Sequence, residues 1–167
     1  GFYMETHSYW QTQDPAKPLF PDIEWNKPEQ RSQAGKLGII GGNKLGFVAA
    51  GDAYAAALDA GAGSVRVLLP NVLRKTIPAA ITDAHFGATN PSGGLSRDAA
   101  PDMLALGQWA SSILMIGDAG RNSETAILYD DFIKDYSGQL TITRDAFDLF
   151  KQTLDTLVDR ENTTLVL

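Results

Sequence analysis

A glycine-rich stretch at residues 41–46 is the first place in the sequence where chemistry could occur. It reads Gly41-Gly42-Asn43-Lys44-Leu45-Gly46 and lies between an apolar run and a helix-like pattern of small residues. Backbone N–H groups at such a helix start can bind phosphate without basic side chains. The spacing is neither G-x-G-x-x-G nor a complete P-loop, because Phe47-Val48 replaces the required Lys-Ser/Thr pair. A tight turn packed closely against the helix is an equally good interpretation.

Three further loops are polar or follow predicted strands, at residues 88–96, 117–122 and 143–148. Ligands of parallel α/β sheets bind beyond the carboxyl ends of the strands, so we expect all four loops at one edge of the sheet. The predicted binding residues in these loops or directly beside them are Gly41, Gly42, Asn43, Gly46, Phe47, Gly117, Gly120 and Asp145.

Isolated titratable residues give weaker signals. Asp118 and Asp145 follow strands, where a carboxylate could meet a metal ion or a hydroxyl, but turn or helix capping explains them equally well. His7 and His85 have no companion for a metal site, and His85 is most simply a satisfied, partly buried histidine in a strand. The absence of cysteine excludes disulfides and thiolate metal sites.

A βαβ unit over residues 36–70 positions the glycine loop. A short apolar run is followed by the loop, by a helix over residues 47–60 and by a second strand. The helix is nearly all apolar or small, which predicts packing on more than one side, with Asp52 and Asp59 on a common face. Gly61 is predicted to end it as the C′ residue.

Strands and helices alternate through the rest of the chain. Asp98 is expected to cap one helix, with Pro101 in its first turn, and Asn122 or Ser123 another. The predicted helices cover residues 71–80, 98–110, 123–136 and 145–160, and the strands residues 84–88, 112–116, 140–143 and 163–167. The fold class is therefore α/β, a three-layer arrangement whose mostly parallel central sheet carries helices on both faces.

The chain divides into an arm, residues 1–35, and one domain, residues 36–167. The arm holds four prolines and six aromatic residues, a composition that predicts an extended segment docked on its own domain or on a neighbouring subunit. A homo-oligomer is therefore left open. A net charge of −6 argues against nucleic acid as a partner. No apolar run reaches the length of a membrane span and no signal peptide is visible, so we expect a cytoplasmic protein.

From Trp25 onward, the order of motifs resembles the N-terminal half of the ADP/ATP-dependent NAD(P)H-hydrate dehydratases, which belong to the ribokinase-like superfamily. The resemblance is carried by Gly41-Gly42, by Gly46-Phe47 and by Ala60-Gly61-Ala62-Gly63, followed by SILMIGDAGRNSET and LTITRDAFDLF. It implies a ribokinase-like fold, ATP or ADP with Mg²⁺ as cofactors, and hydrated NADH or NADPH as the substrate. The reaction so implied is phosphorylation and loss of the ring hydroxyl, which restores the dinucleotide.

The sequence departs from the family pattern at several places. Val48 and Ala49 replace a Thr and a Gly, residues 117–120 form a shortened acidic loop, and only Asp145 matches in Thr143-Arg144-Asp145. The family's catalytic Gly-x-Gly-Asp segment would lie beyond Leu167. We therefore expect a truncated domain that is inactive alone, with the apolar strand at residues 163–167 partly uncovered.

Three other functions remain open. One is a sugar or vitamin kinase of the same superfamily, and another is a non-catalytic nucleotide-binding or assembly module, which the substituted loops favour. The last is a nicotinamide-binding dehydrogenase, which the missing fingerprint disfavours.

Overall fold

A seven-stranded parallel sheet organises the molecule in the computed structural model, which describes residues 10–11, 35–116, 122–143, 146, 160 and 162–166. The strand order is β1-β7-β6-β5-β2-β3-β4, and every neighbouring pair is parallel. The strands are β1 (Trp10–Gln11), β2 (Lys36–Ile40), β3 (Ser64–Pro70), β4 (Ala84–Gly87), β5 (Ser112–Met115), β6 (Gln139–Thr143) and β7 (Thr163–Val166).

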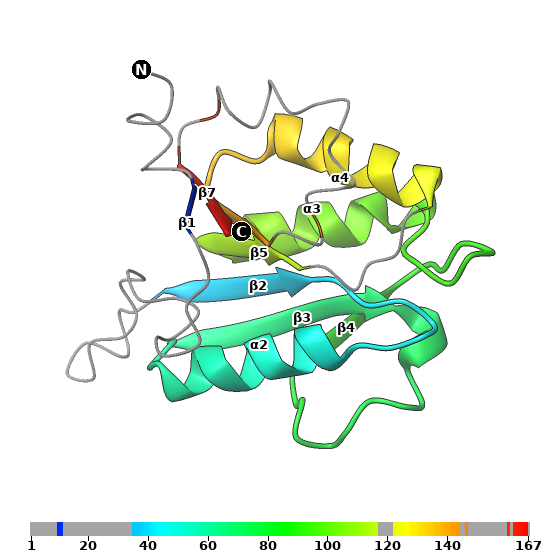
Figure 1. The fold of residues 1–167 in the computed structure, drawn as a ribbon, viewed down its shortest axis with the longest axis horizontal. Helices are drawn as coiled ribbons and strands as arrows, with labels where there is room; N and C mark the ends of the chain where they lie inside the picture. The colour runs from blue at the N-terminus through cyan, green and yellow to red at the C-terminus, as the bar shows by residue number, and fades with distance from the viewer. Residues whose placement is uncertain are drawn as a thin grey trace.

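Helices cover both faces of the sheet, as expected for a three-layer α/β fold (Figure 1). Helix α2 (Val48–Asp59) lies on one face, while α3 (Ala100–Trp109) and α4 (Ser123–Asp135) lie together on the other. Right-handed crossovers require this division. The chain moves from β2 to β3 in one direction along the sheet and later returns past β2 to β5 and β6 in the other.

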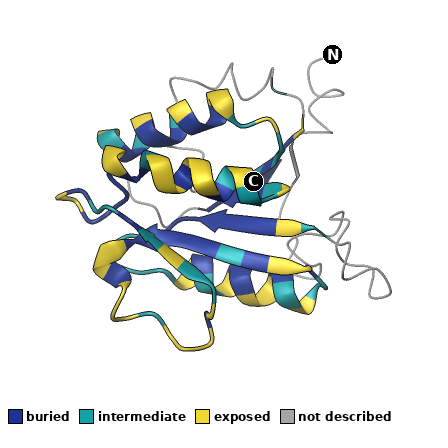
Figure 2. Cartoon of the chain, turned by 180° about the vertical axis from the view of Figure 1, so that it is seen from behind, coloured by how far each residue is buried: buried dark blue, intermediate teal, exposed yellow. Residues whose placement is uncertain are grey.

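Alternating strand residues build two cores, one on each face. Leu37 and Ile39 of β2 pack with α2, whereas Ile40 packs with the layer of α3 and α4. Gly38 also faces α3, since a Cβ there would lie 2.8 Å from Leu106 Cγ. Figure 2 shows buried residues concentrated in the strands and on the inward sides of the helices. The central strands β2, β3 and β5 are therefore largely buried on both faces, as their continuous apolar runs predict.

Several local predictions are confirmed. Helix α4 begins after Asn122, whose Oδ1 accepts a 2.8 Å hydrogen bond from the Glu124 N–H. Gly61 follows α2 with φ +95°, and Pro101 stands in the first turn of α3. Asp52 and Asp59 are both exposed on α2.

Three predictions about helices are wrong. Residues 71–80 form only a 3₁₀ turn at Asn71–Leu73, because Leu73 is the single buried side chain of that turn and Pro78 would interrupt a longer helix. Ser96, not Asp98, caps the 3₁₀ turn that leads into α3. Helix α2 packs on one side only within the described structure: its buried residues are Ala50, Ala53, Tyr54 and Ala57.

The expectation of an uncovered strand at the end of the chain is also wrong for residues 163–166. Strand β7 pairs with β6 on one side and with β1 on the other, through Trp10↔Leu165 and Gln11↔Val166. Leu165 is 0 % exposed and Val166 5 %. The pairing of Trp10–Gln11 with β7 is the part of the arm that the structure describes, and it agrees with an arm docked on its own domain.

Candidate functional site

The candidate site lies where the strand order reverses direction. If β1 is set aside, the strands run across the sheet as third, second, first, fourth, fifth and sixth along the chain. The reversal falls between β2 and β5, whose ends meet through a 3.0 Å hydrogen bond from the Ile116 N–H to the Ile40 carbonyl. Ligands of doubly wound sheets bind in the crevice outside the carboxyl ends of two such strands.

The loop at residues 41–47 leaves β2 at this point and closes a tight turn. Asn43 and Gly46 exchange backbone hydrogen bonds of 3.0 and 2.9 Å, and Asn43 Oδ1 accepts from the Leu45 N–H at 2.7 Å. Gly42 has φ +83°, and a Cβ there would lie 2.9 Å from Leu69 Cδ2. Gly46 lacks a positive φ, and a Cβ at Gly46 would meet nothing within 4 Å. The fold therefore requires glycine at position 42 but not at position 46.

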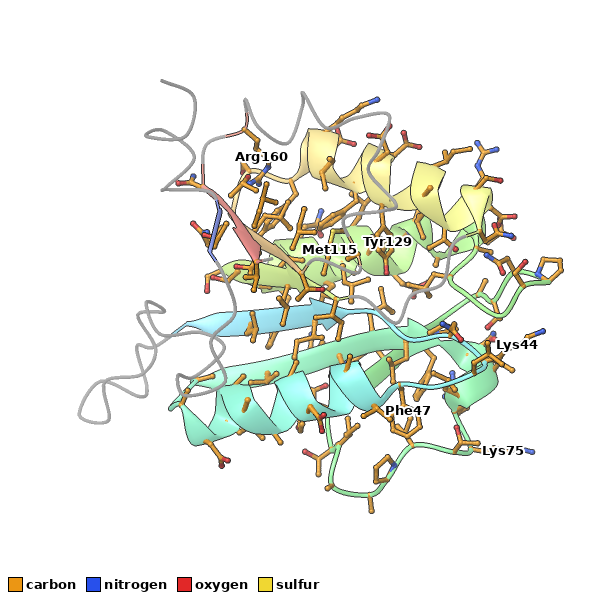
Figure 3. The ribbon with its side chains drawn as sticks, in the orientation of Figure 1. Lys44, Phe47, Lys75, Met115, Tyr129 and Arg160 are labelled. Carbon is orange, nitrogen blue, oxygen red and sulfur yellow. The ribbon has the colours of Figure 1, made fainter. Side chains whose placement is uncertain are left out.

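A second loop, which follows β4, supports the first. The Lys44 N–H donates a 2.8 Å hydrogen bond to the Gly93 carbonyl, so residues 41–47 dock on residues 88–96. Gly93 has φ +90°, and the space of its missing Cβ is filled by the aliphatic part of the Lys44 side chain. Figure 3 shows Lys44 and Phe47 at the end of the molecule toward which β2 points.

The second loop is in turn fixed to the start of α4 by a buried polar cluster. Asn90 is 4 % exposed and Thr125 0 %. The Asn90 side chain donates to Thr125 Oγ1 at 3.0 Å and to the Leu95 carbonyl at 3.2 Å, and it accepts from the Ser92 and Gly94 N–H groups. Outside this cluster, Asn122 Nδ2 donates to Ser92 Oγ at 2.8 Å. The loops after β2 and β4 and the start of α4 thus form one connected unit.

Helix α2 begins directly after the glycine loop, so its first turn lies beside that loop. Phe47 occupies the N-cap position and makes no side-chain hydrogen bond to the helix. Backbone N–H groups in the first turn of a helix have no partner within the helix and carry the positive end of its dipole. Leu45 is 88 % exposed and Val48 72 %, so apolar side chains border this turn. The arrangement can accept an anion through backbone groups, with apolar surface next to it.

The predicted binding residues that the structure describes are neighbours in the sequence. Gly41, Gly42, Asn43, Gly46 and Phe47 all belong to the loop at the switch point. Gly117, Gly120 and Asp145 lie outside the described residues, as does Asp118. Their neighbours Ile116 and Asn122 are described, and both contact this edge of the sheet or its loops.

Sequence reasoning missed Asn90 and Thr125 as site-organising residues. The loop chemistry of Asn90-Pro91-Ser92-Gly93-Gly94 was visible, but the burial of the Asn90 amide was not. His85 is also different from the prediction. Its side chain is 53 % exposed, and its Nε2 lies 2.9 Å from Asp83 Oδ1, which also pairs with Arg66 at 3.2 Å. His85 is therefore an exposed residue that contacts the Asp83 carboxylate, rather than a partly buried histidine.

The remaining observations do not identify a reaction for the candidate site. Within the described residues there is no group of three or more His, Cys, Asp or Glu side chains placed to hold a metal ion. None of the helices seen there has the length and apolar character needed to cross a membrane. Searches with protein-family models and against curated proteins give no match for this chain.

Proposed function

We propose that the carboxyl edge of the sheet binds a nucleotide through backbone N–H groups of the loop at residues 41–47 and the first turn of α2. The observation that carries this proposal is the open position of Gly46 at the β2–β5 switch point. Neither a positive φ nor a steric contact requires glycine at position 46. The residue nevertheless stands where a ligand's phosphate would approach the backbone. A net charge of −6 also favours recognition by backbone dipoles over a basic cluster.

The activity that we propose for this site is nucleotide-dependent dehydration of hydrated NADH or NADPH, with ATP or ADP and Mg²⁺, in the cytoplasm. The support is the resemblance in the glycine loop and in Ala60-Gly61-Ala62-Gly63, together with the three-layer parallel fold. A bound nucleotide would supply the phosphoryl group that turns a ring hydroxyl into a leaving group. The chain's own backbone N–H groups would hold the phosphates, and Leu45 and Val48 would exclude water beside them.

A non-catalytic nucleotide-binding module is the second candidate, because of one specific observation. Val48, the first residue of α2, directs an apolar side chain to solvent at the position where the family has a hydroxyl. No described carboxylate lies in the loop at residues 41–47 to act as a general base. Binding without turnover is the outcome that this candidate predicts.

Calorimetry tests the nucleotide binding that both candidates require. ATP, ADP, NADH and NADPH are titrated with Mg²⁺ into the whole chain and into two variants, Gly46→Val and Lys44→Ala. We expect Gly46→Val to weaken nucleotide binding at least about tenfold, because its side chain would fill the space beside the phosphates. Lys44→Ala should have a much smaller effect.

A repair assay with hydrated NADH then distinguishes the dehydratase from the module. If Lys44→Ala weakened nucleotide binding in the calorimetric titration more than Gly46→Val does, Lys44 would be the phosphate ligand. Binding through backbone N–H groups would then be wrong. If neither variant nor the parent chain bound any of the nucleotides, both candidates would be rejected.

A further inference from the structure

A groove runs between α3 and α4, on the layer opposite α2. Two hollows of about 170 and 380 Å³ share Leu104, Phe132 and Asp135, so they adjoin each other and together make up this groove. It extends from Arg97, at the start of α3, to Gly138, after the end of α4. Its length is therefore that of a helix of several turns.

The groove has an apolar floor and one exposed apolar wall. Met103, Leu128 and Phe132 form the floor and are at most 4 % exposed. Leu104 is 47 % exposed on the wall. At Gly107 the two helices come close, since a Cβ there would lie 3.1 Å from Phe132 Cε1. An apolar strip between two helices is the surface that a third helix covers in helix-in-groove recognition.

Carboxylates dominate the two helices that border the groove. Residues 97–109 and 122–136 contain six acidic and two basic side chains. Asp131 and Asp135 line the groove and are exposed, and one of the two basic residues, Lys134, is paired with Asp130 at 3.1 Å. The remaining basic residue, Arg97, lies at one end. This charge favours a positively charged occupant.

The same charge argues against occupants from this protein. Residues 1–34 contain five acidic and three basic side chains with four prolines, and residues 144–161 also contain five acidic and three basic side chains. A second copy would present the same acidic face. An anionic membrane surface would be repelled as well. The complementary occupant is therefore a basic segment of another protein.

We propose that the α3–α4 groove binds a cationic amphipathic helix of a partner protein. Apolar residues at spacings of three and four along that helix contact Met103, Leu104 and Phe132, while its flanking Lys or Arg side chains pair with Asp131 and Asp135. One end of the groove also lies close to the candidate site. Arg97, at that end, donates a 2.7 Å hydrogen bond from its N–H to Glu124 Oε2 in the first turn of α4. The same turn of α4 holds the loop at residues 88–96 through Thr125.

Fluorescence anisotropy with a designed peptide tests this proposal on the whole chain. The probe is a labelled peptide of about 18 residues, about five helical turns, with Leu on one stripe and Lys on its flanks. Its control carries Glu in place of each Lys. We expect binding of the Lys peptide only, and about five- to tenfold weaker binding by the double variant Asp131→Asn/Asp135→Asn. The matched double variant Asp52→Asn/Asp59→Asn removes the same charge from α2 and should bind like the parent.

Leu104→Glu is a second variant at a half-exposed position, and it should reduce binding more strongly. Thermal unfolding of each variant checks that the fold is retained. Two results would overturn the proposal. One is failure of the Lys peptide to bind. The other is equal weakening of peptide binding by the two double variants, which would show that binding depends on the net charge of the protein and not on the groove. Backbone amide shifts on peptide addition should fall on α3 and α4, and shifts confined to other elements would also reject it.

Discussion

Glycine stands at two positions of the 41–47 loop for different reasons. At Gly42 the backbone has φ +83° and a Cβ would press on Leu69, whereas at Gly46 neither constraint applies. We expect Gly42→Ala to lower the free energy of unfolding by about 1–3 kcal/mol. Gly46→Ala should change it by less than about 0.5 kcal/mol. Urea unfolding of both variants checks this, and equal losses would mean that Gly46 is also required by the fold.

Tyr136 makes stability depend on pH in the alkaline range. Its ring stacks on Phe132 with 5.2 Å between centroids, and its hydroxyl is buried without a hydrogen bond to any residue that the structure describes. Burial raises the pKa of Tyr136 to about 12 from 10.0, although the nearby Arg160 guanidinium opposes the rise. The unfolded chain therefore loses this proton at lower pH than the folded chain does.

The stability that this tyrosine contributes is fully present below about pH 10 and is lost as the pH rises toward about 12. Urea midpoints measured across this window should fall more steeply for the parent chain than for Tyr136→Phe. The loss of stability will be smaller than a pKa change from 10.0 to about 12 would imply for a fully buried group, because Tyr136 is only half-buried. Parallel curves for the two proteins would show that the folded and unfolded states share the same tyrosine pKa.

At the scale of elements, one buried amide connects the loop after β4 to helix α4. Asn90→Ala removes two donated and two accepted hydrogen bonds inside the protein, and it leaves Thr125 buried. We expect it to cost about 3 kcal/mol. Ser92→Ala, which loses one exposed bond to Asn122, should cost less than about 1 kcal/mol and is the matched control. Chemical denaturation compares the two, and similar midpoints would contradict a structural role for the Asn90 side chain.

Elements with local signals could be predicted from the sequence, and those fixed by distant contacts could not. Asn122 and Gly61 act through neighbouring backbone, so their capping roles were predictable. The one-sided packing of α2 depends on which elements lie beyond it, and its alanines do not reveal that. Likewise, the Lys44–Gly93 hydrogen bond joins backbone groups that every residue type except proline carries, so the side chains give no sign of it. The glycine loop was therefore predictable, but its support by residues 88–96 was not.

At the scale of the whole molecule, alternation predicted a parallel sheet but left its strand order open. After β4 the chain could have extended the sheet beyond that edge or returned past β2. It returns, with α3 on the face opposite α2, and so creates the switch point beside residues 41–47. Addition of nucleotide should therefore shift backbone amides at residues 41–47, 88–93 and 122–125. Amides near Trp109 and Lys36, at the amino edge, should not move in the same NMR titration.

The other edge of the sheet depends on the arm. Strand β1 pairs with Leu165 and Val166 of β7, an apolar strand that would otherwise leave unpaired backbone groups at the sheet edge. We compare deletion of residues 1–11, which removes β1, with deletion of residues 1–7, which retains it. The longer deletion should lower the melting temperature and promote self-association in light scattering, while the shorter one should behave like the parent.

The 24 residues between β1 and β2 could span up to about 80 Å, enough for pairing within one chain or between two. A parent chain that is monomeric in these measurements and loses stability only with the longer deletion would establish pairing within the chain, and identical behaviour of the two deletions would show that β1 does not protect β7.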